Sequence, residues 1–264
     1  MHHELPDGLK MYYEVLGNED APWLVLVNGV TQSAPAWKMM TPLLEKDYRI
    51  LIFDFIFQGQ SDKKGEVRPF DQLTDDMVSL LDAVGAQKVY MAGISFGGAA
   101  TQHFMVRYPD RLEKAVLMAT LGKKSEYFKY MEFVWHKTMS TAGMDLLTDF
   151  AFIFSLSENY FENPLVPIDT LKQFSLEIND PVSVQKLMDT MKIREDDYLP
   201  QLEKVTIPTM VVQGSNDTFC TPAMGKEIAD HLPNGEFKTI PNVGHALNLE
   251  AIPQTVEVIR SFCQ

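Results

Sequence analysis

The chain has 264 residues, enough to bury a sizeable core as one large domain or two modest ones. Hydrophobic residues make up 45% and charged residues 22%, a balance typical of a soluble globular protein. The formal net charge of −13 argues against nucleic acid or an anionic membrane as a partner, because both would be repelled.

The number of cysteines and the first ten residues indicate the cellular compartment of the protein. The two cysteines, Cys220 and Cys263, are too few for a disulfide framework, so we expect unpaired thiols in a reducing environment. The first ten residues show neither the apolar segment nor the small-residue cleavage site of a secretory signal. The longest apolar runs, 23–27 and 49–57, have the length of strands and not of membrane spans. These features predict a cytoplasmic protein without membrane insertion.

Between residues 10 and 120, short apolar runs alternate with helical stretches. We expect strands at 10–17, 23–29, 48–55, 88–95 and 112–120, and helices at 35–46, 71–85 and 96–109. Gly85 is well placed to cap the second helix. Strands this uniformly apolar favour a mostly parallel sheet that is flanked by helices on both faces.

From 122 to 205 the pattern changes to aromatic and methionine residues at helical spacing, with no convincing strand. Strand and helix signals then resume at 207–215, 222–232, 236–242 and 251–262. We therefore expect an α/β core from 1–121 and 206–264, with 122–205 inserted as a helical cap. The alternative is a helical block that only packs on the sheet edge.

The motif GISFGG, residues 93–98, follows an expected strand and opens a helix. A strand that turns sharply into a helix forces Ser95 into a strained conformation, and the flanking glycines give the turn room. This geometry exposes the hydroxyl at the carboxyl edge of the sheet, beside a helix N-terminus that favours negative charge. Ser95 is therefore the candidate nucleophile; the alternative is a glycine-rich packing turn.

A serine hydroxyl needs a base and the base needs an orienting acid, which in this arrangement follow in the chain order Ser, Asp, His. Asp217 lies in a loop between an expected strand and a helix opened by Pro222, and His245 lies in a later loop after Gly244. We expect Ser95, Asp217 and His245 to form a catalytic triad. Asp217 is the least distinctive member, since an Asp after a strand is often a turn residue, and Asn216 or Asp230 could be confused with it.

An oxyanion hole needs two backbone N–H groups. We expect them from Phe96, directly after the nucleophile, and from Val30, in the loop where Asn28-Gly29 ends a strand. The histidines are scattered and the cysteines have no CxxC spacing, so no metal site is expected. GISFGG does not fit a dinucleotide-binding pattern, and we expect no cofactor.

Through the Ser95 turn and the order of Asp217 and His245, the chain resembles the α/β-hydrolase superfamily from its first strands to its last helix. The resemblance implies the α/β-hydrolase fold with a helical cap insertion, and a serine hydrolase activity.

Two segments depart from the common esterase pattern. Asn28-Gly29 stands where many members have His-Gly, and DFIFQGQS (54–61) carries Phe57 where many have glycine. Both are similar to the acyltransferase family that joins 3-hydroxyacyl groups from thioesters into the lipid precursor of rhamnolipids, the hydroxyalkanoyloxyalkanoate synthases. The GISFG elbow differs from the one expected in that family, and the cap shows no match to it.

These observations predict a serine hydrolase that cleaves a carboxylic ester or thioester of an apolar acyl group through an acyl-enzyme on Ser95. The alternatives are an acyltransferase joining 3-hydroxyacyl groups, cofactor-free haloperoxidase chemistry on the same triad, and a non-catalytic small-molecule binder. The expected partner is a small-molecule substrate, while acyl length and oligomeric state are left open. Candidates for an apolar pocket are Phe128, Met131, Phe133, Trp135, Met139, Phe150, Phe152 and Phe154, with Asn28 beside them.

Overall fold

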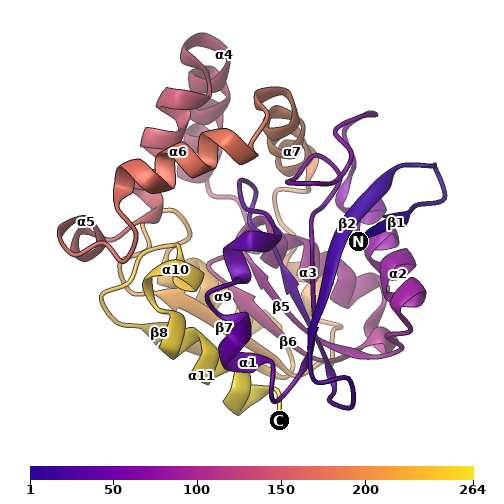
Figure 1. The fold of residues 1–264 in the computed structure, drawn as a ribbon. Helices are drawn as coiled ribbons and strands as arrows, with labels where there is room; N and C mark the ends of the chain where they lie inside the picture. The colour runs from indigo at the N-terminus through magenta and orange to yellow at the C-terminus, as the bar shows by residue number, and fades with distance from the viewer.

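The computed structural model describes residues 1–264 and contains one eight-stranded sheet with helices on both faces (Figure 1). The strand order is β1-β2-β4-β3-β5-β6-β7-β8. β1 pairs antiparallel with β2, and β2 antiparallel with β4, while all the other pairs are parallel. The strands are β1 (His2–Glu4), β2 (Lys10–Gly17), β3 (Trp23–Val27), β4 (Arg49–Phe53), β5 (Val89–Ile94), β6 (Leu112–Met118), β7 (Thr209–Gly214) and β8 (Gly235–Ile240). The predicted α/β-hydrolase fold, with a mostly parallel sheet, is confirmed.

The central strands bury both of their faces. Along β3, Val25 and Val27 belong to one hydrophobic cluster, and Leu24 and Leu26 belong to another. Successive strand residues point to opposite faces, so each cluster lies on one side of the sheet. Helices α2 (Phe70–Val84), α3 (Phe96–Arg107) and α9 (Pro222–His231) contribute to the first cluster, and α11 (Ile252–Phe262) contributes to the second.

The structure differs from the sequence-based prediction in two places. The helix expected at 35–46 is a 3₁₀ turn (Ala34–Trp37) followed by the short α1 (Thr41–Leu44). Pro42 explains the break, because it lacks the N–H that a continuous helix would donate to the carbonyl of Lys38. The short strand β1 was missed, because its three residues leave no recognisable period.

Four helices fill most of the expected cap, and Figure 1 shows them standing over one edge of the sheet. They are α4 (Glu126–Ser155), α5 (Glu158–Glu162), α6 (Ile168–Ile178) and α7 (Pro181–Ile193). A small hydrophobic cluster of their own joins α4 to α7, including Met144 and Met188. α4 bends at Gly143, which has φ of 80°. The smaller elements are the 3₁₀ turn Pro109–Arg111, α8 (Leu199–Leu202) and α10 (Leu247–Glu250).

The boundary between cap and core stays a proposal. Leu199 and Leu202 of α8 lie inside the range 122–205 but belong to the large hydrophobic cluster of the core. We therefore propose that the chain returns to the core a few residues before 206. Among the helices, none combines the length and apolar character that crossing a bilayer would require.

Candidate active site

Ser95 lies at the sharp turn from β5 into α3, with φ of 55° and ψ of −113°. The turn is tight on both sides: a Cβ on Gly93 would lie 2.3 Å from the carbonyl oxygen of Gly97. A Cβ on Gly97 would lie 2.2 Å from the carbonyl oxygen of Val27, in β3. The backbone N–H of Ser95 donates to the carbonyl of Met118 at 2.9 Å, which ties the turn to β6. The glycines are thus needed because neighbouring backbone occupies the space of their side chains.

Asp217 and His245 are joined by a hydrogen bond of 2.8 Å between Asp217 Oδ2 and His245 Nδ1. The Asp217 side chain is fully buried, and its Oδ1 accepts the backbone N–H groups of Phe219 at 2.9 Å and Cys220 at 2.8 Å. Three donors therefore hold the carboxylate, and one of them is the imidazole. With Nδ1–H bound to a carboxylate, Nε2 carries the lone pair that a base needs.

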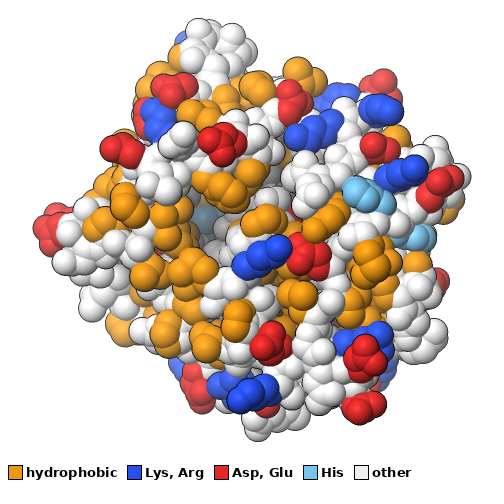
Figure 2. Space-filling model, viewed as in Figure 1, with side chains coloured by type: hydrophobic (Ala, Val, Ile, Leu, Met, Phe, Trp, Pro, Cys, Tyr) orange, Lys and Arg blue, Asp and Glu red, His pale blue; other side chains and the backbone are white.

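Ser95 and His245 line the same cavity of about 280 Å³, which we call the outer cavity. Figure 2 shows a hollow bordered by hydrophobic side chains between the cap helices and the core. No hydrogen bond joins Ser95 Oγ to the His245 ring in this structure. Such bonds are often long without substrate and shorten in the reactive complex.

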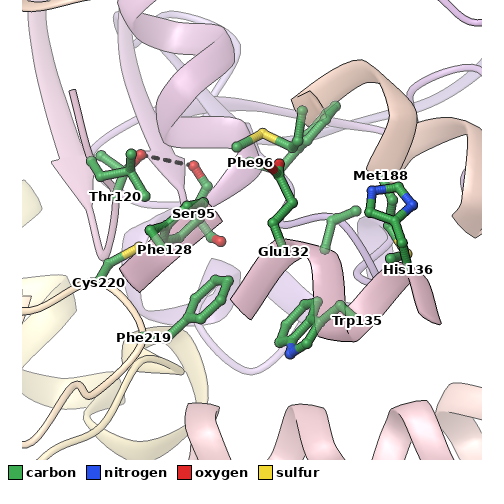
Figure 3. Close-up of a pocket in the computed structure, with 13 residues that line it drawn as sticks. Ser95, Phe96, Thr120, Phe128, Glu132, Trp135, His136, Met188, Phe219 and Cys220 are labelled. Atoms are coloured by element: carbon green, nitrogen blue, oxygen red, sulfur yellow. Dashed lines mark hydrogen bonds between the residues drawn. The ribbon is translucent and has the colours of Figure 1, made fainter. Parts of the chain in front are cut away.

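A smaller chamber of about 50 Å³, the inner chamber, adjoins the outer cavity (Figure 3). The walls of both spaces share Val30, Ser95, Trp135, Met188 and Phe219. The outer cavity includes exposed side chains in its wall, whereas no residue lining the inner chamber is exposed. Ser95 thus lies where a space with no exposed residue in its wall meets one whose wall includes exposed residues.

The two backbone groups expected to bind an oxyanion are both free of partners within the protein. Phe96 is the first residue of α3, where N–H groups have no acceptor in the helix. The Val30 N–H donates to no protein group, and the Val30 side chain lines both spaces beside Ser95. Gln58 Nε2 holds this loop by donating to the carbonyl of Gly29 at 2.8 Å.

Some of the candidate pocket residues line one of the two spaces, and others do not. Phe128 and Trp135 line the inner chamber, whereas Met131 and Met139 do not line either space and pack in hydrophobic clusters instead. Phe133 is 55% exposed and so lies outside the pocket. Among the other aromatic candidates, Phe152 lines the outer cavity.

The assignment of Asn28 to substrate binding is wrong. Its side chain is completely buried, and its amide donates to the carbonyl of Phe53 at 2.6 Å. Its Oδ1 accepts the indole N–H of Trp37 at 2.7 Å. Both ends of the amide are occupied by the protein, so Asn28 fixes the loop that carries Val30 and does not face a ligand.

Sequence reasoning missed eight residues that line the inner chamber. These are Thr120, Leu121, Glu132, His136, Met188, Met191, Phe219 and Cys220. The Phe219 ring meets the His245 ring edge-on at 5.0 Å and stacks on Trp135 at 4.8 Å. Its position two residues after Asp217 was the one available signal. Burial raises the pKa of the Cys220 thiol, so the neutral thiol prevails and does not compete as a nucleophile.

The loop of His245 is tied to the end of the long cap helix. The carbonyl of Ser155 accepts the backbone N–H of His245 at 2.7 Å and that of Ala246 at 3.1 Å. Glu250 accepts the N–H of Gly244 at 3.3 Å and that of Ser157 at 3.2 Å. Burial raises the pKa of the Glu250 carboxyl. The backbone of His245 is therefore held by the end of α4, while its ring is held by Asp217 in the loop after β7.

We expect Gly244→Ala to lower both stability and activity. A Cβ there would lie 2.7 Å from the carbonyl oxygen of Ser155 and 2.8 Å from the N of Ser157. Relieving this overlap costs about 1–3 kcal/mol and shifts the His245 loop. Urea denaturation and kcat/KM on a short acyl ester measure the two effects. Wild-type values for both would show that these contacts do not hold the loop.

A covered, mostly parallel sheet with a serine turn at its carboxyl edge defines a hydrolase of the α/β class. The sequence model of the family described as alpha/beta hydrolase fold matches residues 22–252, and the chain belongs to this family. In addition, no group of three or more His, Cys, Asp or Glu side chains is arranged to hold a metal ion.

Individual relatives are distant but cover nearly the whole chain. A proline iminopeptidase from Pestalotiopsis fici is 26% identical over 98% of this chain and 97% of its own length. A 3-oxoadipate enol-lactonase from Acinetobacter baylyi is 21% identical over 90% of this chain and 87% of its own. The crystal structure of an enol-lactonase from Burkholderia xenovorans matches with a TM-score of 0.90 at 21% identity, over 100% of this chain and 99% of that one. At this identity the structural likeness shows the shared fold.

Proposed function

We propose that the protein is a serine hydrolase that cleaves a carboxylic ester or thioester of an apolar acyl group through an acyl-enzyme on Ser95. The observation that carries this proposal is the buried Asp217–His245 hydrogen bond of 2.8 Å beside the cavity that Ser95 lines. A pair of this kind orients an imidazole as a base, and the Val30 and Phe96 amides, which have no partner within the protein, support the proposal as donors for an oxyanion.

In the proposed reaction, Ser95 Oγ attacks the carbonyl carbon while His245 Nε2 takes the hydroxyl proton. The oxyanion accepts the Val30 and Phe96 N–H groups, and the carbonyl re-forms as the alcohol or thiol leaves with the proton from His245. Water then attacks the acyl-enzyme, His245 takes its proton, and Ser95 regains that proton as the acid is released. Asp217 stays ionised and stabilises the imidazolium in both halves.

The apolar walls of both spaces support an apolar acyl group, since Phe96, Leu121 and Phe128 line the inner chamber beside Ser95. We expect the 4-nitrophenyl ester of pentanoate to exceed that of acetate by about ten- to a hundredfold in kcat/KM, because three more methylenes are buried in the transition state. Steady-state kinetics over C2 to C8 chains measure this. A flat or acetate-biased profile would reject the apolar acyl site.

The acyltransferase remains the second candidate, and the two spaces that meet at Ser95 favour it. One could hold the acyl group while the other admits a second, hydroxyl-bearing acyl group in place of water. The likeness of residues 27–29 and 53–61 to 3-hydroxyacyl-thioester acyltransferases stays a prediction, and none of the relatives named above is described as one. Mass spectrometry of the products from 3-hydroxyacyl thioesters separates the two: free acids support the hydrolase, and linked hydroxyacyl esters the acyltransferase.

A binding protein without turnover is the third candidate. A binder has no need of a carboxylate that orients an imidazole beside a serine, so the Asp217–His245 pair speaks against it. A fluorophosphonate probe distinguishes the two, because it labels only an activated serine. Absence of label on Ser95 would support the binder.

A further inference from the structure

The inner chamber carries polar groups at the side opposite Ser95. Figure 3 shows Glu132, Trp135 and His136 on one side of the pocket, and Ser95, Thr120 and Cys220 on the other. The first three residues come from α4 and share one face of that helix by their spacing. Proton transfer at Ser95 uses none of them.

The proton on His136 can be assigned from its neighbours. Gln185 Nε2 lies 3.1 Å from Asp189 Oδ1, to which it donates, and 2.8 Å from His136 Nδ1. An amide nitrogen only donates, so His136 Nδ1 accepts and Nε2 carries the hydrogen. Burial lowers the pKa of His136, which favours this neutral form.

Two N–H donors in this wall therefore lack acceptors. His136 Nε2 is buried and unpartnered, and so is Trp135 Nε1. The His136 ring lines the chamber and its Nδ1 is occupied by Gln185, so Nε2 is the ring nitrogen left to bind a molecule in the chamber. Buried donors are normally satisfied, so each of these groups calls for an acceptor.

The charges around the wall select the kind of acceptor. The Glu132 carboxylate accepts Lys124 Nζ at 3.2 Å and 3.3 Å, so this buried pair is neutral overall. Because the charge of Glu132 is already paired, a ligand carboxylate or ammonium would bring an uncompensated charge into the chamber. A neutral oxygen, such as a ketone carbonyl, satisfies an N–H donor without adding a charge.

The inner chamber is also the side on which the acyl part would stay. A leaving group must depart and water must enter before the acyl-enzyme breaks down, and only the outer cavity has exposed residues in its wall, including Met39 and Phe174. The inner chamber, whose wall has no exposed residue, therefore suits the group that remains bound to Ser95.

We infer that the inner chamber is a subsite for a short acyl group that carries a neutral oxygen beyond the scissile carbonyl, with His136 Nε2 as the donor that selects it. This inference rests on the proposed function, because it assumes an acyl-enzyme on Ser95. It names the substrate class as oxo-acyl esters or thioesters, and His136 as a specificity residue remote from the reacting atoms.

The test compares 4-nitrophenyl esters of three similar acyl groups: pentanoyl, 4-oxopentanoyl and the charged succinyl. We expect kcat/KM for 4-oxopentanoyl to exceed that for pentanoyl by about tenfold, the size of one hydrogen bond in a buried site. Succinyl should fall below pentanoyl. In His136→Phe the ratio of kcat/KM for 4-oxopentanoyl to that for pentanoyl should fall to about one, and His136→Gln, which restores an N–H donor, should recover part of the ratio.

Comparing each ratio between variants cancels the intrinsic reactivity of the esters. Phe133→Leu, an exposed change on the same helix, is the matched control and should leave the ratio unchanged. A wild-type ratio near one, a ratio that survives in His136→Phe, or a preference for succinyl would overturn the subsite. Failure of the proposed function looks different, since pentanoyl turnover would then be absent or would persist in Ser95→Ala.

Discussion

Ser95→Ala should lower kcat by about 10⁴- to 10⁶-fold while the protein stays folded. The loss follows from chemistry alone, since no other hydroxyl or thiol that lines the inner chamber is placed to act. Thr120 Oγ1 lies 3.0 Å from the carbonyl oxygen of Ser95 and donates to it, and the Cys220 thiol is buried and protonated. The strained turn already accommodates a Cβ at φ of 55°, so alanine adds no new strain.

Steady-state kinetics on the pentanoyl ester and thermal unfolding of the same preparation measure the two parts of this expectation. Ser261→Ala is the matched control, because Ser261 lies on α11 and bonds only within its own helix. A fluorophosphonate should add mass to the wild-type chain and to the control but not to Ser95→Ala. Turnover retained in Ser95→Ala would exclude a serine nucleophile and with it the acyl-enzyme.

The parts of the site that the sequence predicted are those with local signals. Ser95 is flanked by glycines that the turn requires, and Asp217 lies in the loop shortly after the end of β7 at Gly214. The carboxyl ends of parallel strands meet at one edge of a sheet, so these residues converge once the fold class is recognised. The fold itself was predictable for the same reason, because uniformly apolar strands separated by helices leave few arrangements.

The parts that could not be predicted depend on contacts between distant segments. Asn28 looked like a pocket residue, yet Trp37 and the carbonyl of Phe53 occupy its amide. Helical spacing showed which face of α4 turns inward but not whether a residue there meets a cavity or a neighbouring helix. Trp135 meets a cavity and Met139 does not, and only the packing of α7 against α4 decides between them.

His245, the proposed base, is held by two segments that lie far apart in the sequence. Its carboxylate partner is placed by the loop after β7, but its own backbone N–H is held by Ser155 at the end of α4. We therefore expect a change at the end of α4 to shift the position of His245 even where the changed residue does not contact the substrate. This coupling explains why a glycine is needed at 244, where a side chain would meet both Ser155 and Glu250.

Asp217→Asn should lower kcat by about 10⁴-fold while leaving the shape of the site unchanged. Asparagine has the same size, and its Oδ1 can still accept the N–H groups of Phe219 and Cys220. Its amide nitrogen then faces His245 Nδ1 at the position where a carboxylate oxygen stood at 2.8 Å. An amide N–H donates to Nδ1, so the imidazole must carry its hydrogen on Nε2.

That tautomer reverses the role of the base. With hydrogen on Nε2, the imidazole has no lone pair to take the Ser95 proton, and the lost carboxylate no longer stabilises the imidazolium. Asp230→Asn is the matched control, because Asp230 is the other aspartate that sequence reasoning had to set aside, and it is exposed on α9 in a pair with Lys226. The kcat of both variants on the pentanoyl ester shows whether Asp217 belongs to the triad. If Asp217→Asn keeps a kcat within tenfold of wild type, or if Asp230→Asn loses as much, Asp217 is not a member of the triad. A loss confined to Asp217→Asn would show that the tautomer of His245 controls the reaction.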